Sequence, residues 1–363
     1  MCITSIFLWE EIMEKIKFVQ IGCGKMSVYT MRNAIENGYE IVGAVDINKD
    51  IIGKDVGTIM GRSDVGVDIK NVSQLDTLLK ETKPNVAIVT TMSLMKDVED
   101  SLMICAKNGV NAITTCEEAF YPWNSNPNLT EELDKLAREN NCTITGSGYQ
   151  DIFWGQLITS ICGATQSIKN IIGESWYNVE DYGFALAEAH GAGLSLSEFD
   201  EKIASVDRMS SEERQKLIDE GIYSPSYMWN VNGWLCEKLG LTVKSQSQKC
   251  VPETYSEDIE SSTLCMTIKA GDATGMSAVV ITETEEGITL ETKCVGKVYA
   301  PDEFDINEWT VIGEPDTTIT VKRPATVELT CASVVNRLPD LVEAKAGFVA
   351  TSSMKDLNYK INI

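Results

Sequence analysis

Histidine is almost absent from the sequence, and cationic side chains are scarce. The chain has one histidine among 363 residues, and 31 lysines and arginines stand against 54 aspartates and glutamates, a formal net charge of −23. One histidine is too few for the two- and three-histidine metal sites of most zinc enzymes. The acidic excess repels polyanions, which argues against nucleic acid or an anionic membrane surface as a partner.

Long apolar runs and closely spaced cysteines are missing as well. No stretch approaches the roughly 18 consecutive apolar residues of a membrane-spanning helix. The eleven cysteines are scattered and never form C-x-x-C. We therefore interpret them as reduced, mostly buried side chains of a cytoplasmic protein without a metal site. Residues 1–14 lack the basic start of a secretory signal and are expected to be a short N-terminal extension.

Short β-branched runs alternate with helix-like segments in the first part of the chain. This alternation is typical of βαβ units, in which a parallel sheet is covered on both faces. We therefore predict an α/β fold, with a doubly wound Rossmann sheet in residues 15–148. The expected strands are residues 16–21, 40–45, 86–91, 111–116 and 142–146.

The pattern changes after Gly148. Longer alternating segments separated by glycine-containing turns predict a mainly antiparallel sheet in an α+β domain over residues 149–323. Its expected strands are residues 167–179, 261–270, 276–283, 287–300 and 308–321, and a helix is expected over residues 151–163. Residues 324–363 begin with a proline and an apolar periodic segment, which predicts a C-terminal helix.

A glycine-rich turn follows the first expected strand. Residues 22–27 read GCGKMS, a variant of the G-x-G-x-x-G fingerprint in which Ser27 takes the third glycine position. Between a strand and a helix this pattern indicates a dinucleotide site, although an ordinary turn is the alternative. Its expected cofactor contacts are Gly22, Cys23, Gly24, Lys25 and Met26.

Asp46 ends the second expected strand, about 20 residues after the glycine-rich turn. A carboxylate there accepts hydrogen bonds from a ribose 2′-hydroxyl and repels a 2′-phosphate, which favours NAD over NADP. Three nearby cations, Lys49, Lys54 and Arg62, could reach a phosphate and leave NADP open.

Polar residues follow the third and fourth expected strands. Thr90, Thr91 and Met92 could line the cofactor, or simply end a strand. Glu117 and Glu118 stand at the next strand end, between an apolar strand and an aromatic cluster. One carboxylate in a cleft could hold an ammonium group or remove its proton, whereas on a surface the pair would be a solvated turn. Alternation suggests that only one faces the cofactor, and Glu117 is slightly favoured.

Two aromatic segments belong to the expected second domain. Phe153 and Trp154 lie in the glycine-rich junction GSGYQDIFWG, and Tyr177 lies in WYNVEDYG, shortly before His190. We predict that these side chains contact the substrate. The alternatives are that the aromatic residues pack in the core and that His190 is a structural hydrogen-bonding group.

The segments GCGKM, AVDINKDIIGKDVG, TTCEEAFYPW, ITGSGYQDIFWG and PATVELTCASVVNRLPD together resemble the dihydrodipicolinate-reductase-like oxidoreductases. Within them, the chain is similar to the 2,4-diaminopentanoate dehydrogenase and native amine dehydrogenase family. That resemblance implies a homodimer in which residues 324–363 return to the Rossmann domain. It implies reversible NAD(P)-dependent oxidative deamination of an amine to a ketone and ammonia, with a glutamate of the CEE motif handling protons. It places Trp154, Tyr177 and His190 in the substrate pocket and Asn336 near the nicotinamide.

The same resemblance limits the substrate. Dihydrodipicolinate reductases carry a histidine pair and a basic anion-binding cluster, and this sequence has only His190 and no H-H-x-x-K. An acidic, aromatic pocket instead suits an amine cation, so the expected partners are a small amine or ketone and ammonium. Two alternatives stay open: an imine or ketone reductase that uses no ammonia, and a non-catalytic sensor of NAD(H).

Overall fold

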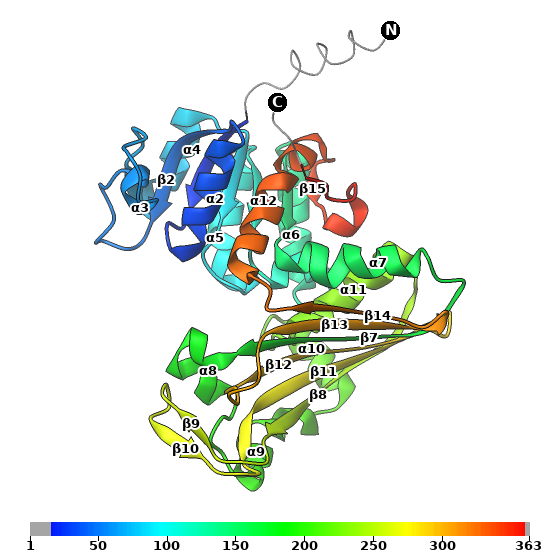
Figure 1. The fold of residues 1–363 in the computed structure, drawn as a ribbon. Helices are drawn as coiled ribbons and strands as arrows, with labels where there is room; N and C mark the ends of the chain where they lie inside the picture. Colours follow the sequence, from blue (N-terminus) through cyan, green and yellow to red (C-terminus); the bar gives the residue numbers. More distant parts are fainter. Residues whose placement is uncertain (1–15, 360–363) are drawn as a thin grey trace. The chain divides into compact units, whose positions relative to one another are not determined.

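The computed structural model describes residues 16–359, which fold into two units (Figure 1). Of these residues, unit 1 takes in 16–123, 127–152 and 326–359, and unit 2 takes in Asn124–Asn126 and Phe153–Ala325. The N-terminal extension expected at residues 1–14 lies outside the described residues. Within residues 16–359, none of the helices combines the length and the apolar character needed to cross a bilayer.

Unit 1 is built on a parallel sheet. Its seven strands are ordered β15-β6-β5-β4-β1-β2-β3, and every neighbouring pair is parallel. The predicted doubly wound sheet is therefore confirmed. The strands are β1 Lys17–Ile21, β2 Glu40–Asp46, β3 Ile69–Asn71, β4 Val86–Val89, β5 Asn111–Thr114, β6 Thr143–Gly146 and β15 Gly347–Phe348.

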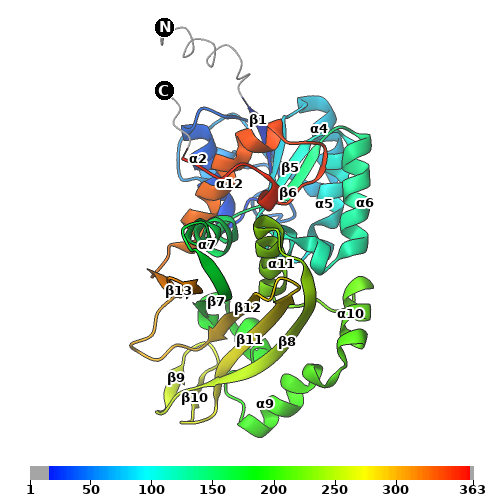
Figure 2. The ribbon, with the colours of Figure 1, turned by 90° about the vertical axis from the view of Figure 1, so that its right-hand side faces the viewer.

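Helices cover both faces of this sheet, as Figure 2 shows. On one face, α4, α5 and α6 bury leucine, valine and methionine side chains against the strands. On the other face, α2 and α12 supply side chains such as Met31 and Leu338. The helices are α2 Lys25–Glu36, α3 Val56–Ile59, α4 Leu75–Thr82, α5 Met95–Lys107, α6 Pro127–Glu139 and α12 Thr326–Glu343.

Unit 2 contains a six-stranded mixed sheet in the order β14-β13-β7-β12-β11-β8. Only the β7–β12 pair is parallel, so the prediction of a mainly antiparallel sheet is confirmed. Asn232 on α11 (Tyr227–Leu239) hydrogen-bonds Thr282 and Thr292, which fixes this helix on one face of the sheet. The strands are β7 Ser167–Asn178, β8 Val243–Thr254, β11 Ala273–Thr284, β12 Thr289–Lys297, β13 Ile306–Glu314 and β14 Thr317–Lys322.

Several elements of unit 2 differ from the prediction. The single strand expected over residues 261–270 is instead a pair of short strands, β9 Ile259–Ser261 and β10 Met266–Ile268, separated by a turn in which Cys265 has φ 53°. The strand expected over residues 308–321 is also divided, at a turn where Asp316 accepts a hydrogen bond from the Gly313 N–H. The helix expected over residues 151–163 begins with a π-helical turn, η4 (Asp151–Gln156), and continues as α7 (Leu157–Cys162).

Candidate functional site

The glycine-rich turn joins β1 to α2 in unit 1. Gly22 has φ +84°, and a Cβ there would stand 2.8 Å from the Thr90 carbonyl oxygen, so only glycine fits. Gly24, the N-cap of α2, has nothing within 4 Å of its Cβ position, and none of the described side chains caps this helix N-terminus. Open space before a helix N-terminus fits the pyrophosphate of a dinucleotide. Lys25 and Met26 are the first two residues of α2.

Asp46 is fixed against this turn. Its Oδ2 accepts a hydrogen bond from the Cys23 N–H at 2.5 Å, and its Oδ1 accepts one from the Asn48 N–H at 2.7 Å. Burial, together with the Asp46 charge, raises the pKa of the Cys23 thiol to about 12. Cys23 therefore contributes its backbone and its packing, and its thiol is unreactive.

The end of β4 supplies both buried and exposed residues. Thr90 is buried, and its hydroxyl donates to the Gly22 carbonyl and accepts from the Gln20 amide, so it supports the turn. Thr91 is exposed. Met92 is 54% exposed, and Ile47, directly after Asp46, is 77% exposed. Large apolar side chains this exposed at the carboxyl edge of a parallel sheet are candidates for ligand contact. Sequence reasoning missed Ile47, whose only signal was its position after the acidic strand end.

The two acids after β5 have different surroundings. Glu118 is 4% exposed. Its Oε2 accepts a hydrogen bond at 2.6 Å from the backbone N–H of Met95, which is the first residue of α5. Leu94, the N-cap of α5, has no side-chain acceptor, so the Glu118 carboxylate serves this helix end instead.

Glu117 is half-buried and lies closer to solvent than its neighbour. Burial raises the pKa of its carboxyl group, and hydrogen bonds from the Ser93 hydroxyl and from its own backbone N–H lower the pKa in part. Ser93 also accepts a backbone hydrogen bond from the Glu118 N–H at 3.2 Å. The preceding Cys116 is fully buried, which raises the pKa of its thiol well above the ordinary value.

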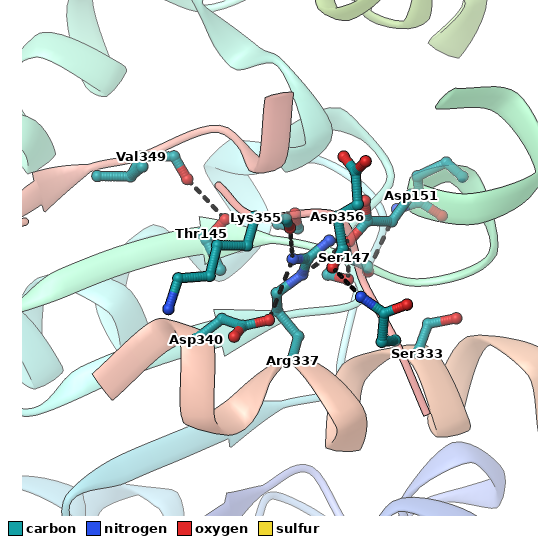
Figure 3. Close-up of polar contacts among 12 residues, drawn as sticks. Thr145, Ser147, Asp151, Ser333, Arg337, Asp340, Val349, Lys355 and Asp356 are labelled. Atoms are coloured by element: carbon teal, nitrogen blue, oxygen red, sulfur yellow. Dashed lines mark hydrogen bonds and ion pairs between the residues drawn. The ribbon is translucent and has the colours of Figure 1, made fainter. Parts of the chain in front are cut away.

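The helix α12 brings Asn336 and Arg337 into unit 1. Asn336 is half-buried. Arg337 is fully buried and forms the centre of a polar network (Figure 3). Its Nε and Nη2 donate to Asp151 Oδ2 at 3.1 and 2.8 Å, and its Nη1 donates to the Lys355 carbonyl at 2.6 Å. The Ser147 hydroxyl also donates to Asp151. Sequence reasoning missed this network, because its members are far apart along the chain.

Tyr177 and His190 form a hydrogen-bonded pair in unit 2. His190 Nδ1 lies 2.8 Å from the Leu186 carbonyl oxygen, which can only accept, so Nδ1 carries the proton. His190 Nε2 therefore accepts from the Tyr177 hydroxyl, 2.6 Å away. Burial lowers the pKa of His190 and raises that of Tyr177. Both groups are neutral. Each ring nitrogen of His190 already takes part in a hydrogen bond, so His190 could influence a ligand only through Tyr177.

Gly296 makes this pair possible. A Cβ at this position would stand 2.6 Å from the Tyr177 hydroxyl and 2.5 Å from the His190 ring. The other expected substrate residues of unit 2, Phe153 and Trp154, are half-buried in η4, and the Phe153 carbonyl accepts a hydrogen bond from Asn307.

The structure thus brings the predicted residues together in two groups. The glycine-rich turn, Asp46, the β4 end and the acid pair all stand at the carboxyl edge of adjacent strands β2, β1, β4 and β5 in unit 1. Tyr177 and His190 meet within unit 2. Among residues 16–359, no group of three or more histidine, cysteine, aspartate or glutamate side chains is arranged to hold a metal ion.

Comparison with known proteins identifies relatives of the chain. No family model matches it. The 2,4-diaminopentanoate dehydrogenase of Acetoanaerobium sticklandii is 26% identical over 202 residues, which are 53% of this chain and 54% of that protein. The 4-hydroxy-tetrahydrodipicolinate reductase of Methanocaldococcus jannaschii is 33% identical over 93 residues, 24% of this chain and 30% of that protein. The aligned regions span about half of the first curated relative and under a third of the second.

A solved structure matches over almost the whole chain. The amine dehydrogenase from Mycobacterium smegmatis is 34% identical with a TM-score of 0.80, and the match covers 95% of this chain and 97% of that one. The resemblance stated from the sequence motifs is confirmed. The chain belongs to the amine dehydrogenase family.

Proposed function

We propose that this protein is an NAD(P)-dependent amine dehydrogenase. It would catalyse the reversible oxidative deamination of an amine or diamino acid, such as 2,4-diaminopentanoate, to a ketone and ammonia. The observation that carries the proposal is the half-buried Glu117 carboxyl group with a raised pKa. It follows β5, two strands away from the glycine-rich turn after β1.

Residues at this edge would hold the cofactor. Gly22, Cys23, Gly24 and the first residues of α2 would hold the pyrophosphate at the helix N-terminus. The Asp46 carboxylate would accept hydrogen bonds from the ribose hydroxyls. The exposed side chains of Ile47 and Met92 would make apolar contacts with the cofactor. When bound, the nicotinamide accepts or donates the hydride.

NAD is the favoured cofactor. The Asp46 carboxylate is held in place by two backbone N–H groups, and its charge repels a 2′-phosphate. One of the nearby cations, Arg62, already faces Glu36 at 3.9 Å. Lys49 and Lys54 are exposed and are the residues that NADP would need.

Glu117 would move the proton of the substrate amine. An alkylammonium ion must lose a proton before its carbon can release a hydride, because the nitrogen lone pair stabilises the iminium ion that forms. The Glu117 carboxylate can accept that proton, since burial gives it a raised pKa and therefore a greater basicity. Water then adds to the iminium carbon, and ammonia leaves as the ketone forms. In the reverse direction, the same group returns the proton.

Tyr177 would contact the substrate amine. The Tyr177 hydroxyl donates to His190, and its oxygen still has a lone pair that can accept a hydrogen bond from an ammonium group. Phe153 and Trp154 would surround the apolar part of the substrate. Asn336 would lie near the nicotinamide. These four assignments are supported by the family membership and by the chemistry of the side chains.

The test is a panel of amines and diamino acids incubated with NAD⁺ and with NADP⁺. The expected result is amine-dependent appearance of the reduced cofactor, and ammonium-dependent consumption of it when a ketone is supplied. Oxidation of NADH by a ketone without ammonium would identify a reductase instead. Tight NAD(H) binding without turnover of any amine or ketone would identify a sensor.

We also propose that the protein is a cytoplasmic homodimer, as in the family that its motifs resemble. A solution mass twice that of the 40.0 kDa chain would support the dimer, and the mass of a single chain would contradict it.

A further inference from the structure

The side chain of Gln20, in β1, contacts the glycine-rich turn and is fully buried. Its Nε2 donates hydrogen bonds to the Gly22 carbonyl at 3.0 Å and to the Thr90 hydroxyl at 2.9 Å. Its Oε1 accepts a hydrogen bond from the Thr30 hydroxyl, in α2, at 2.9 Å. Because a carbonyl oxygen can only accept, the contact with Gly22 fixes which end of the amide faces the turn.

The backbone of Gly22 is held on both sides of its Cα atom. Its carbonyl accepts a second hydrogen bond, from the Thr90 hydroxyl at 3.1 Å, in addition to the one from Gln20. Its N–H donates to the Val45 carbonyl, at the end of β2, at 2.9 Å. Glycine has no Cβ to restrict its backbone, so the turn depends on these contacts to keep one conformation.

One peptide group connects these contacts to Asp46. The Gly22 carbonyl and the Cys23 N–H belong to the same peptide unit, which is planar, so fixing the carbonyl also fixes the direction of the N–H. The Cys23 N–H donates to Asp46 Oδ2 at 2.5 Å. Gln20 and Thr90 therefore hold the carbonyl end of this peptide, and its N–H end holds the Asp46 carboxylate.

We propose that Gln20 is a positioning residue, which keeps the Asp46 carboxylate in one orientation through the Gly22–Cys23 peptide and so strengthens recognition of a ribose 2′-hydroxyl. The proposal rests on the proposed function in one respect, namely that Asp46 accepts this hydroxyl of NAD⁺. Without the Gln20 amide, the peptide can rotate about Gly22, and Asp46 is left with the hydrogen bond from the Asn48 N–H. The protein should then lose discrimination for the 2′-hydroxyl.

The experiment measures cofactor binding by the full chain, without turnover. Calorimetric titration gives the dissociation constants of NAD⁺ and of 2′-deoxy-NAD⁺, which lacks the 2′-hydroxyl of the adenosine ribose. The wild type should bind NAD⁺ roughly tenfold more tightly, the effect of one hydrogen bond to a charged group. Gln20→Met removes the amide but keeps the length of the side chain, and it should lower this ratio by at least about threefold.

A second variant and a control accompany Gln20→Met. Thr90→Val removes the other donor to the Gly22 carbonyl with little change in side-chain shape, so it should also lower the ratio, and it tests the proposal if Gln20→Met does not fold. Thr143→Val is the matched control. It removes the hydroxyl of another buried threonine of unit 1, which donates to the Lys345 carbonyl at 2.9 Å, and it should keep the wild-type ratio.

Asp46→Ala shows whether the ratio reports on this carboxylate. It should abolish the difference between the two cofactors, because the group that accepts the 2′-hydroxyl is gone. If the difference survives in Asp46→Ala, the proposal is overturned. A wild type that binds the two cofactors equally, or binds neither, overturns it as well.

The same measurements separate positioning from general support of the turn. If Gln20→Met, or Thr90→Val in its place, weakens both cofactors equally and leaves the ratio unchanged, the amide supports the turn without orienting Asp46, and the proposal is wrong. Amine oxidation is assayed beside the titrations. If the wild type binds NAD⁺ but oxidises no amine, the proposed function fails, whereas the ratio still decides the role of Gln20.

Discussion

Replacing Glu117 should lower the activity of the protein and change its pH dependence. Replacement by Gln keeps the size of the side chain but removes the base, so the deamination rate should fall by about 10²–10⁴-fold. In the wild type only the carboxylate accepts the proton, so the rate should fall as pH decreases through the raised Glu117 pKa. The measurement is kcat against pH for the deamination reaction.

The matched control is Glu131→Gln, which changes an exposed glutamate on α6. It should keep the wild-type rate and the same acid limb. An acid limb that persists unchanged in Glu117→Gln would assign the proton transfer to another group.

Removing the charge of Asp46 should change the preference between NAD⁺ and NADP⁺. Asp46→Asn keeps an oxygen that can accept from the Cys23 N–H but removes the charge that repels a 2′-phosphate. The ratio of kcat/KM for NADP⁺ to that for NAD⁺ should therefore rise by roughly tenfold, the effect of about 1.4 kcal/mol. Asp50→Asn, in the exposed segment that follows, should leave this ratio unchanged. A wild-type preference for NADP⁺ would contradict the role given to Asp46.

The sequence identified the acid pair, but it did not show which of the two acids is accessible. The position of Glu117 and Glu118 after an apolar strand was enough to predict a site at the sheet edge. Which acid stays accessible depends on Ser93 and Met95, which belong to the loop of the neighbouring strand. Such a contact depends on how two loops meet, which alternation along one strand does not determine.

Among the elements, the free edge of β8 is protected by side chains instead of a strand. Asp207 of η6 (Ala204–Arg208) accepts from the Cys250 N–H at 2.7 Å, and Arg214 of α10 (Ser211–Asp219) donates to the Gln248 carbonyl at 2.8 Å. Figure 2 shows α10 beside this edge of the sheet. Asp207 and Arg214 also form a largely buried ion pair at 3.2 Å.

Asp207→Ala should destabilise unit 2 by about 3 kcal/mol, because it leaves the buried Arg214 without its counter-charge. Urea unfolding measures the change. The control is Asp200→Ala, which breaks an ion pair with Arg208 at the exposed surface and should change the free energy of unfolding by less than about 1 kcal/mol. Equal losses in the two variants would show that the edge contact contributes nothing beyond a surface pair.

This edge strand was also an element that the sequence did not predict. Residues 244–249 of β8 read KSQSQK, and so few β-branched residues give no strand signal. A polar edge strand is tolerated because its outer groups are bound by Asp207 and Arg214. The five longer strands of unit 1 were predictable, because their apolar runs reflect burial on both faces. The short β3 and β15 contribute too few residues to give a pattern.

Across the whole chain, segments far apart in sequence meet at Arg337. This residue joins Asp151, at the start of η4, to the carbonyl of Lys355 near the C-terminal end of the described residues (Figure 3). Asp151 directly precedes Ile152, the last residue of unit 1 before the chain enters unit 2 at Phe153. The Arg337 network therefore fixes the last residues of unit 1 before Phe153 and Trp154.

Arg337→Met removes the charge but keeps an apolar stem, and it leaves the fully buried Asp151 without its cation. Unit 1 should lose about 3–5 kcal/mol of stability, and amide hydrogen exchange in β6 and α12 should accelerate. Lys355→Met is the matched control, because it removes a cation from the same C-terminal segment but breaks only an exposed pair with Glu343. It should change stability by less than about 1 kcal/mol. If the two variants unfold at the same urea concentration, the tie between the chain ends of unit 1 comes from the apolar face of α12, and the ion pair adds little to it.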